Sequence, residues 1–292
     1  MQLLILIIMI LMFIFIPWFR CAVLHPLSTI RYLITDVYKY IRYRRWREYR
    51  KIGTLSILTG LFGKGKTLML TKMVRGIYKK YNGRKVYDFK EKKWKIQYIN
   101  IVSNVQLNDI PYIELKNLSD MMMYADDRYS DGVSVWIFCV DEMSTQVNSR
   151  EYKTNFSTEL LNVLLTCRHY RFKILGTAQR FNHVDALVRQ VTQVASECNK
   201  MWRLCTVYHY NAWTLENTSD ITKIKPVSRQ CYFIKDKDFK AYDTTATVKN
   251  FKDNVREGNI LTDSEIMQYQ LAQSENYNAL HLKKRFRKKL NG

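Results

Sequence analysis

The segment Gly60-Leu61-Phe62-Gly63-Lys64-Gly65-Lys66-Thr67 decides the fold of this chain, because it matches the phosphate-loop pattern GxxxxGK[ST] at every defined position. Glycines let successive backbone N–H groups converge on phosphate oxygens, an approach that a Cβ atom would obstruct. We expect Lys66 to reach the β- and γ-phosphates and the Thr67 hydroxyl to bind Mg²⁺. The whole segment is therefore a predicted nucleotide-binding loop, with ATP and Mg²⁺ as its cofactors.

The flanking sequence has the order that such a loop requires. Residues 51–59 are short, apolar and β-branched, which predicts a strand leading into the loop. After the loop, apolar side chains recur at helical spacing: Leu68, Met69, Leu70, Met73, Val74 and Ile77. A glycine-rich turn between unrelated elements is the alternative interpretation, and the succession of strand, loop and helix argues against it.

An acidic pair follows a second apolar stretch. Residues 133–140 form a continuous apolar run of strand length, as expected for a parallel strand buried on both faces, and Asp141 and Glu142 come directly after it. In this arrangement Asp141 binds Mg²⁺ through water, and Glu142 polarises the attacking water as general base. Alone, the pair is also compatible with a solvated strand end.

Two further strands are predicted, with a helix before the second. Residues 94–104 are strand-like, residues 156–170 are helical in pattern, and residues 173–179 form a strand that ends in Gln179. The implied order puts an additional strand between the strands that carry the loop and the acids. The predicted fold class is α/β, a RecA-like phosphate-loop NTPase with an additional central strand. Gln179 is expected to sense the γ-phosphate, with a turn-stabilising role as the alternative.

These motifs resemble the FtsK-HerA superfamily of DNA-pumping ATPases. The resemblance rests on GLFGKGKT, on SNVQL at 103–107, on VWIFCVDE, on CRHYRFKILGTAQ and on VDALVRQV, and it covers about residues 52 to 210. Within the superfamily the chain is most similar to the zonular occludens toxin-like assembly ATPases of filamentous phages, and next to the genome-packaging ATPases of membrane-containing viruses. The toxin-like proteins usually place their membrane helix after the ATPase domain, whereas here the hydrophobic segment comes first.

Ring-forming ATPases complete each site with an arginine from the next subunit. Three arginines are candidates for this catalytic role. Arg180 follows the sensor and would lie near the chain's own nucleotide, whereas Arg168 would lie at the opposite sheet edge and face a neighbour. Val184, Leu187, Val188, Val191 and Val194 define an apolar helix face, and Arg189 falls away from its centre, so we expect Arg189 to be exposed.

The N-terminal segment predicts an uncleaved membrane anchor. Residues 3–16 contain no polar side chain, and Pro17, Trp18 and Phe19 extend this run to a length near the lower limit of about 17 residues for a spanning helix. A signal peptide would begin with a basic region and end at a small-residue cleavage site, whereas this run is preceded by Met1 and Gln2 and is not followed by such a site. Basic residues follow the segment, so the positive-inside rule predicts a single-pass protein of the host inner membrane or the virion membrane, with its ATPase domain in the cytoplasm.

The formal net charge of +21 implies a polyanionic partner, either nucleic acid or anionic lipid. The basic residues before position 52 are assigned to lipid headgroups, although a run of Tyr and Arg also fits a nucleic-acid surface. The tail at 283–289 follows a capping-box pattern, Thr262 to Glu265, and is expected to bind DNA backbone without sequence preference. The six cysteines include no CxxC, so neither zinc nor a disulfide framework is indicated.

The chain divides into an N-terminal transmembrane anchor at 1–26, a basic juxtamembrane segment at 27–51, the ATPase domain at 52–250, and a C-terminal helical extension with a basic tail at 251–292. Residues 208–250 are expected to add edge strands. The expected function is a membrane-anchored ATPase that forms a ring, as a hexamer, and moves DNA or a DNA–protein complex in phage or virus morphogenesis, with virion or coat proteins as further partners. Genome packaging in a membrane-containing virus and a membrane-tethered coupling protein of conjugation or secretion are the alternatives.

Overall fold

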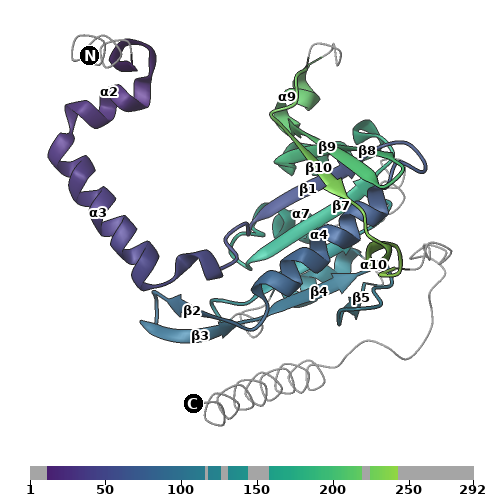
Figure 1. Cartoon of the computed structure of the whole chain (residues 1–292). Coiled ribbons are helices and arrows are strands. Elements are labelled where there is room, and N and C mark those ends of the chain that lie inside the picture. The colour runs from purple at the N-terminus through teal and green to yellow at the C-terminus, as the bar shows by residue number, and fades with distance from the viewer. Residues whose placement is uncertain (1–11, 116–117, 126–130, 144–157, 219–223, 243–292) are drawn as a thin grey trace.

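A twisted eight-stranded sheet forms the centre of the molecule (Figure 1). The computed structural model describes residues 12–115, 118–125, 131–143, 158–218 and 224–242. The strands stand in the order β10-β9-β8-β1-β7-β6-β4-β5. Their bounds are β1 Thr54–Thr59, β4 Ile99–Ser103, β5 Ile113–Glu114, β6 Val135–Val140, β7 Phe172–Ala178, β8 Val194–Met201, β9 Leu204–Asn211 and β10 Ser228–Phe233.

The predicted additional strand is present. β7 pairs in parallel with β1 on one side and with β6 on the other, so it separates the strand that enters the phosphate loop from the strand that ends in the acidic pair. Every residue of β6 and β7 is buried, as their continuous apolar sequences predict. The carboxyl ends of β1, β7 and β6 consequently meet at one edge of the sheet.

Helices cover both faces of the sheet. On one face α4 (Lys66–Tyr81) packs Leu68, Met69, Leu70 and Val74 against β1, β4 and β6. On the other face lie η2 (Leu118–Tyr124), α7 (Thr158–Leu165) and α8 (Ala186–Val191), with η5 (Phe181–His183) beside them. The sheet is therefore the middle of three layers, with a separate apolar core on each side.

The edge strands expected at 208–250 are found in part, since β10 lies in this range, β9 begins before it at Leu204, and β8 precedes it. β9 is antiparallel to both β8 and β10, and the three strands extend the parallel sheet beyond β1. α9 (Ala212–Asn217) follows β9, and α10 (Asp236–Phe239) follows β10. The part of the prediction that covers 243–250 lies outside the described residues, as do the C-terminal extension at 251–292 with Thr262 and Glu265 and the basic tail at 283–289.

The single strand expected at 94–104 is a wrong prediction. The stretch forms β3 (Lys93–Gln97), which pairs with β2 (Arg84–Asp88) in a separate hairpin, and then β4 in the main sheet. β3 carries Lys93, Trp94 and Lys95 and is partly exposed, whereas β4 is almost fully buried. The change from charged to apolar side chains at Tyr98 marks the point where the chain enters the core.

The helix expected through Val194 is shorter than predicted. α8 ends at Val191, and Val194 is the first residue of β8. Gln193 leaves the helical path because its backbone and its side chain both bond to the backbone of Leu55 in β1. The apolar residues continue at helical spacing to Val194, but pairing of this segment with β1 ends the helix before it.

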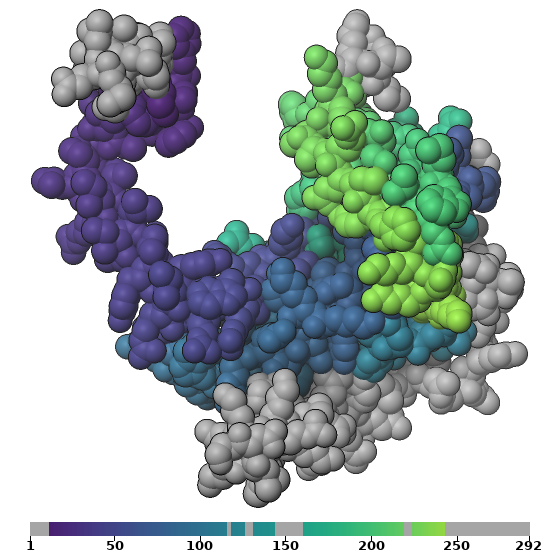
Figure 2. Space-filling view, in the orientation of Figure 1, coloured from purple at the N-terminus to yellow at the C-terminus, as the bar shows by residue number. Residues whose placement is uncertain are grey.

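An N-terminal arm projects from the domain (Figure 2). It consists of α2 (Pro17–Leu24) and α3 (Pro26–Arg42), neither of which has a buried residue, and ends in η1 (Arg45–Arg47). Tyr43 anchors its base by stacking on Tyr87 of the β2–β3 hairpin, with ring centroids 4.2 Å apart. Residues 1–11, which hold most of the apolar run at 3–16, lie outside the described residues, and no helix in the described part is both long and apolar enough to cross a membrane.

Candidate functional site

The phosphate loop has the backbone conformation that its glycines predict. Gly60 has φ +150° and Gly65 has φ +83°, both in regions that L side chains rarely adopt. A Cβ at Gly60 would lie 2.9 Å from the carbonyl oxygen of Cys198, and one at Gly65 would lie 3.2 Å from Lys200. Backbone conformation and the close approach of β8 therefore both favour glycine at Gly60 and Gly65, as the phosphate-loop pattern predicts.

The loop leads directly into α4. Gly65 is the N-cap of this helix and provides no side-chain cap, so the first N–H groups of α4 have no partner within the helix. Such a terminus attracts anions through these donors and through the helix dipole. Lys66, the first helical residue, folds back so that its Nζ donates to the carbonyl oxygen of Leu61 at 3.3 Å. One positive side chain and the helix terminus therefore face the same loop.

Asp141 meets Thr67 across the sheet. Thr67 Oγ1 donates to Asp141 Oδ2 at 2.9 Å, although the residues come from different strand–loop units. A hydroxyl and a carboxylate at this separation form the oxygen donor set that suits Mg²⁺, with Thr67 as ligand and Asp141 acting through water. The residues present therefore fit the expected ion.

Two residues that the sequence analysis did not single out fix Asp141. The buried Thr177 hydroxyl on β7 donates to Asp141 Oδ1. Asn104, just after β4, accepts from the backbone N–H of Asp141 at 2.7 Å and donates to its carbonyl oxygen at 3.0 Å. A polar residue at the carboxyl end of each neighbouring buried strand was the signal that could have identified both.

Glu142 has an uncommon backbone conformation. Its φ of +48° lies in the left-handed region, and its N–H donates to Thr177 Oγ1 at 2.9 Å. Left-handed backbone in a non-glycine residue is concentrated at functional sites. The Thr177 hydroxyl therefore bonds to both acids of the pair, and it links their positions to the strand that ends in Gln179.

Gln179 lies beside the loop, as its place after β7 predicts. Thr59 of β1 pairs with Ala178 of β7, and the N–H of Gly60 donates to the carbonyl oxygen of Gln179 at 3.3 Å. The backbone of Gln179 therefore supports the start of the phosphate loop. The sensing role of its side chain remains a prediction.

A pocket of about 300 Å³ joins these elements. One wall comes from the loop and the start of α4, and another from Asp141 and Glu142. Three further lining residues, Lys200, Phe239 and Tyr242, come from β8 and from the chain after β10, and the sequence analysis missed them. The pocket thus combines the components of an ATP-hydrolysing site: a phosphate cradle, an oxygen donor pair and a carboxylate suited to general-base chemistry.

The three candidate arginines lie in different settings. Arg180 is exposed next to Gln179, and Arg168 is exposed at the far end of the sheet, where its side chain lies against Gly53 at the start of β1. The expectation that Arg189 is exposed is wrong. Its guanidinium is half-buried and pairs with both carboxylate oxygens of Glu216, at 2.7 and 3.0 Å, because α9 packs across α8.

Among known proteins, structures similar to this chain are found among the solved structures. No family model matches the chain, and no curated protein matches it. The N-terminal domain of zonular occludens toxin from Neisseria meningitidis is 16% identical, with a TM-score of 0.41, and the match covers 66% of this chain and 100% of that one.

The DNA-packaging ATPase B204 from Sulfolobus turreted icosahedral virus is 10% identical, with a TM-score of 0.39, and the match covers 64% of this chain and 100% of that one. Both matches are distant in sequence and in structure, and the function is therefore inferred from the residues of the site.

Proposed function

We propose that this chain is a membrane-anchored ATPase that couples ATP hydrolysis to movement of DNA or a DNA–protein complex during virion assembly. The observation that carries the proposal is the meeting of Thr67, Asp141 and Glu142 at one sheet edge, beside a loop shaped to hold phosphates. Binding alone would not require a second acid, whereas hydrolysis requires a group that takes a proton from water.

The chain's own residues divide the chemistry among them. The loop and the N-terminus of α4 bind the phosphates, and Lys66 adds positive charge that stabilises the charge developing on the γ-phosphate. Thr67 and Asp141 would hold Mg²⁺, which supplies further charge neutralisation when bound. Glu142 orients the attacking water and accepts its proton, and its fixed backbone limits the positions that its carboxylate can adopt.

The net positive charge of the chain favours DNA, a polyanion, as the partner that the ATPase moves. The formal net charge of +21 exceeds what a nucleotide site requires. Contacts of lysine and arginine with the phosphate backbone supply affinity without sequence information. A motor that acts along the whole length of a genome needs this kind of contact.

The arm supports attachment to a membrane. On α3 the apolar side chains Leu27, Ile30, Leu33, Ile34, Val37 and Ile41 are all exposed and recur at helical spacing. Residues 26–51 carry eight basic and two acidic side chains. A helix of this type suits the surface of an anionic bilayer, next to the apolar segment at 3–16.

ATP turnover in the presence of DNA tests the proposed function. Wild-type protein should hydrolyse ATP faster when double- or single-stranded DNA is added, and the stimulation should fall as salt rises because the contacts are electrostatic. Lys66→Ala provides the matched control for contaminating activity. Turnover that does not respond to either form of DNA would contradict movement of DNA and favour a coupling protein that switches partners.

A further inference from the structure

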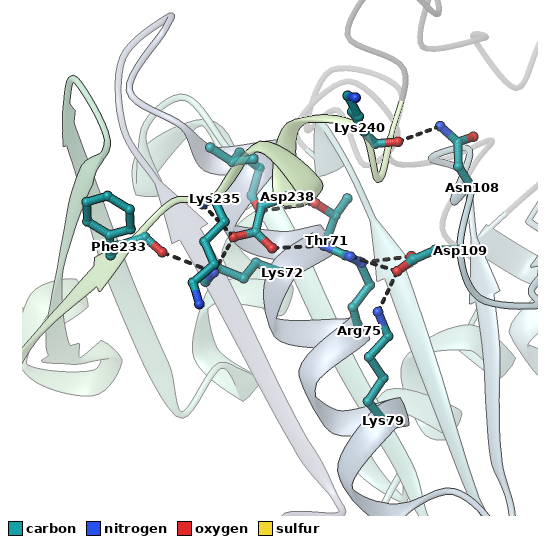
Figure 3. A network of polar contacts seen from close by, with 11 residues as sticks. Thr71, Lys72, Arg75, Lys79, Asn108, Asp109, Phe233, Lys235, Asp238 and Lys240 are labelled. Atoms are coloured by element: carbon teal, nitrogen blue, oxygen red, sulfur yellow. Dashed lines mark hydrogen bonds and ion pairs between the residues drawn. The ribbon is translucent and has the colours of Figure 1, made fainter.

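A short segment after β10 closes one side of the nucleotide pocket. Residues 234–242, here called the strap, contain α10 and run across the N-terminal half of α4 (Figure 3). Ile234, Asp238 and Ala241 of the strap are buried. The strap therefore packs as part of the domain.

Asp238 fixes the strap to α4. Its carboxylate, which is 4% exposed, accepts from Lys72 at 2.5 Å and from Arg75 at 3.0 Å, and both of these residues belong to α4 (Figure 3). The same carboxylate accepts from the backbone N–H of Lys235 at 3.0 Å. A buried carboxylate with two cationic partners on one helix forms charge-assisted hydrogen bonds that tie the strap to α4.

The end of the strap is held at a second point. Asn108 donates from its backbone N–H to the carbonyl oxygen of Ala241 and from its side chain to that of Lys240, at 2.9 and 3.0 Å. The neighbouring Asp109 accepts two bonds of 2.7 Å from Arg75 (Figure 3). The strap is therefore attached at Asp238 and at Lys240 and Ala241, on either side of Phe239.

Two aromatic side chains of the strap line the pocket, one toward each end. Tyr242 forms a β-bridge with Leu107, three residues after the Asn104 that bonds to Asp141, and it lines the pocket together with Asp141, so it belongs to the metal end. Phe239 lies with Lys200, whose Nζ is 5.3 Å from the ring centroid and whose methylene groups lie against Gly65. Phe239 is thus on the β8 side of the loop.

Phe62, the third aromatic residue of the pocket, offers a less fixed surface for a ligand than Phe239 does. Phe62 is 74% exposed on the loop, and Lys66 Nζ lies 5.7 Å from its ring centroid. Phe239, in contrast, is half-buried on a segment tied to α4. Of the aromatic rings lining the described pocket, it alone is both fixed and away from the metal end.

We propose that the strap is the base-binding wall of the nucleotide pocket, with Phe239 as the residue against which the purine ring of ATP packs. This inference rests on the proposed binding of ATP at residues 60–67. The loop provides for the phosphates only, and a heterocyclic base needs an apolar surface with a π-face. Lys200 Nζ and the guanidinium carbon of Arg203 lie 5.3 and 5.8 Å from the centroid of this ring, so both cations border the same surface.

Inorganic tripolyphosphate separates the base from the phosphates in a direct test. Isothermal titration with Mg²⁺ would measure the affinities of ATP and of tripolyphosphate for wild type, Phe239→Ala, Phe239→Trp and Phe233→Ala. Phe233 is exposed on β10 and does not line the pocket, so its variant is the matched control. Phe239→Ala should lower the affinity for ATP about tenfold, the size expected for one lost stacking contact, and leave that for tripolyphosphate unchanged.

The remaining outcomes distinguish the inference from its premise. Phe239→Trp should retain the wild-type affinity for ATP, because a larger ring keeps the stacking surface. If Phe239→Ala binds ATP as wild type does, or loses ATP and tripolyphosphate to the same extent, the base-binding role is wrong while the phosphate site stands. If wild type binds neither ligand, the proposed function itself fails.

Asp238→Asn tests the positioning role of the ion pairs. The variant keeps the size of the side chain and removes its charge, so the strap loses two charged contacts to α4. ATP affinity should fall toward that of Phe239→Ala with tripolyphosphate affinity kept. Unchanged ATP affinity in Asp238→Asn would show that the strap holds Phe239 without these pairs and would overturn the positioning role.

Discussion

Thr177 is the residue on which the geometry of the acidic pair depends. Its hydroxyl donates to Asp141 and accepts from the N–H of Glu142, and it is fully buried. An apolar side chain of the same shape would leave both partners without this bond. Residues that orient catalytic groups in this way have measurable effects on turnover even when they do not touch the substrate.

Thr177→Val should reduce ATP turnover by about 10- to 100-fold, the range known for lost orienting contacts. ATP affinity should change little, because the phosphate loop is untouched. Thr177→Ser keeps the hydroxyl and is the matched control. Steady-state hydrolysis and ATP titration measure the two quantities, and equal turnover in the valine and serine variants would contradict the orienting role.

Lys173 is a buried base on β7, away from the nucleotide pocket. Burial, and to a lesser extent the charge of Lys51, lowers its pKa to about 8, although its ammonium donates to the hydroxyls of Thr54 and Ser56. The unfolded chain has the ordinary value of 10.5 and binds the proton more readily. Stability therefore rises with pH between about 8 and 10.5 at this residue, and the full penalty is present below that window.

Lys173→Met should lack this rise. Other groups titrate in the same range, so the informative quantity is the difference in melting temperature between wild type and variant at neutral pH and at about pH 10. We expect wild type to gain stability relative to the variant as pH rises. A difference that is constant with pH would show that the pKa of Lys173 is the same in the folded and the unfolded chain, and it would contradict the effect of burial on this residue.

At the scale of elements, the strand–loop–helix unit and the acidic strand followed from the sequence because each is continuous and strongly patterned. The phosphate loop, the buried strand β6, and β7 as the additional strand between β1 and β6 were predicted correctly. Their apolar runs are buried on both faces, so no competing interaction changes the assignment.

Other elements could not be predicted from the sequence because they depend on contacts between residues that are far apart in the chain. α8 ends early because Gln193 bonds to Leu55, and Arg189 is not available because Glu216 pairs with it. The strap was missed for the same reason: Asp238 finds Lys72 and Arg75 more than 160 residues away. No local pattern in residues 234–242 reports these partners.

The ion pairs between the strap and α4 predict that the stability of the folded protein falls at acidic pH. Burial raises the pKa of Asp238, but the bonds and charges of Lys72, Arg75 and the Lys235 N–H outweigh it and hold the pKa below the ordinary 3.8. Because the folded value is the lower one, the contribution of Asp238 is present above pH 3.8 and is lost as pH falls through the folded value.

Asp238→Asn should therefore be less stable than wild type near neutral pH, and the gap should narrow as pH falls below about 4. Thermal unfolding over this range measures the gap. Asp236→Asn on the exposed side of α10 is the matched control, because this carboxylate pairs with Arg203 near the surface and not, among the described residues, with α4. A gap that stays constant to low pH would contradict the role assigned to the Asp238 charge.

At the scale of the whole molecule, the exposed arm predicts a preference among membranes. Arg31, Lys39 and Arg42 of α3 would face anionic headgroups, so replacing all three with Glu should weaken binding to vesicles of phosphatidylserine and phosphatidylcholine. Binding to vesicles of phosphatidylcholine alone should change less. Arg229→Glu on β10 is a control at an exposed position away from the arm, and equal loss on both kinds of vesicle would contradict a charge-based contact.

A ring would bring Arg168 or Arg180 of one copy to the site of the next, and the two sites differ in what they predict. Arg168 lies at the sheet end opposite its own phosphate loop, so mixing Arg168→Ala with Lys66→Ala should restore turnover at mixed interfaces. An arginine that acts within its own subunit gives no such restoration. Turnover of the mixture that equals the sum of the separate variants would exclude Arg168 from a role in trans.

The central claim is that this sheet edge hydrolyses ATP with Glu142 as the base. Turnover and ATP affinity measured together on wild type and Glu142→Gln test it most directly. We predict that the variant binds ATP with unchanged affinity and loses at least about 100-fold in turnover, the lower range for a general base. Turnover by Glu142→Gln at the wild-type rate, with ATP bound equally well by both proteins, would contradict the account.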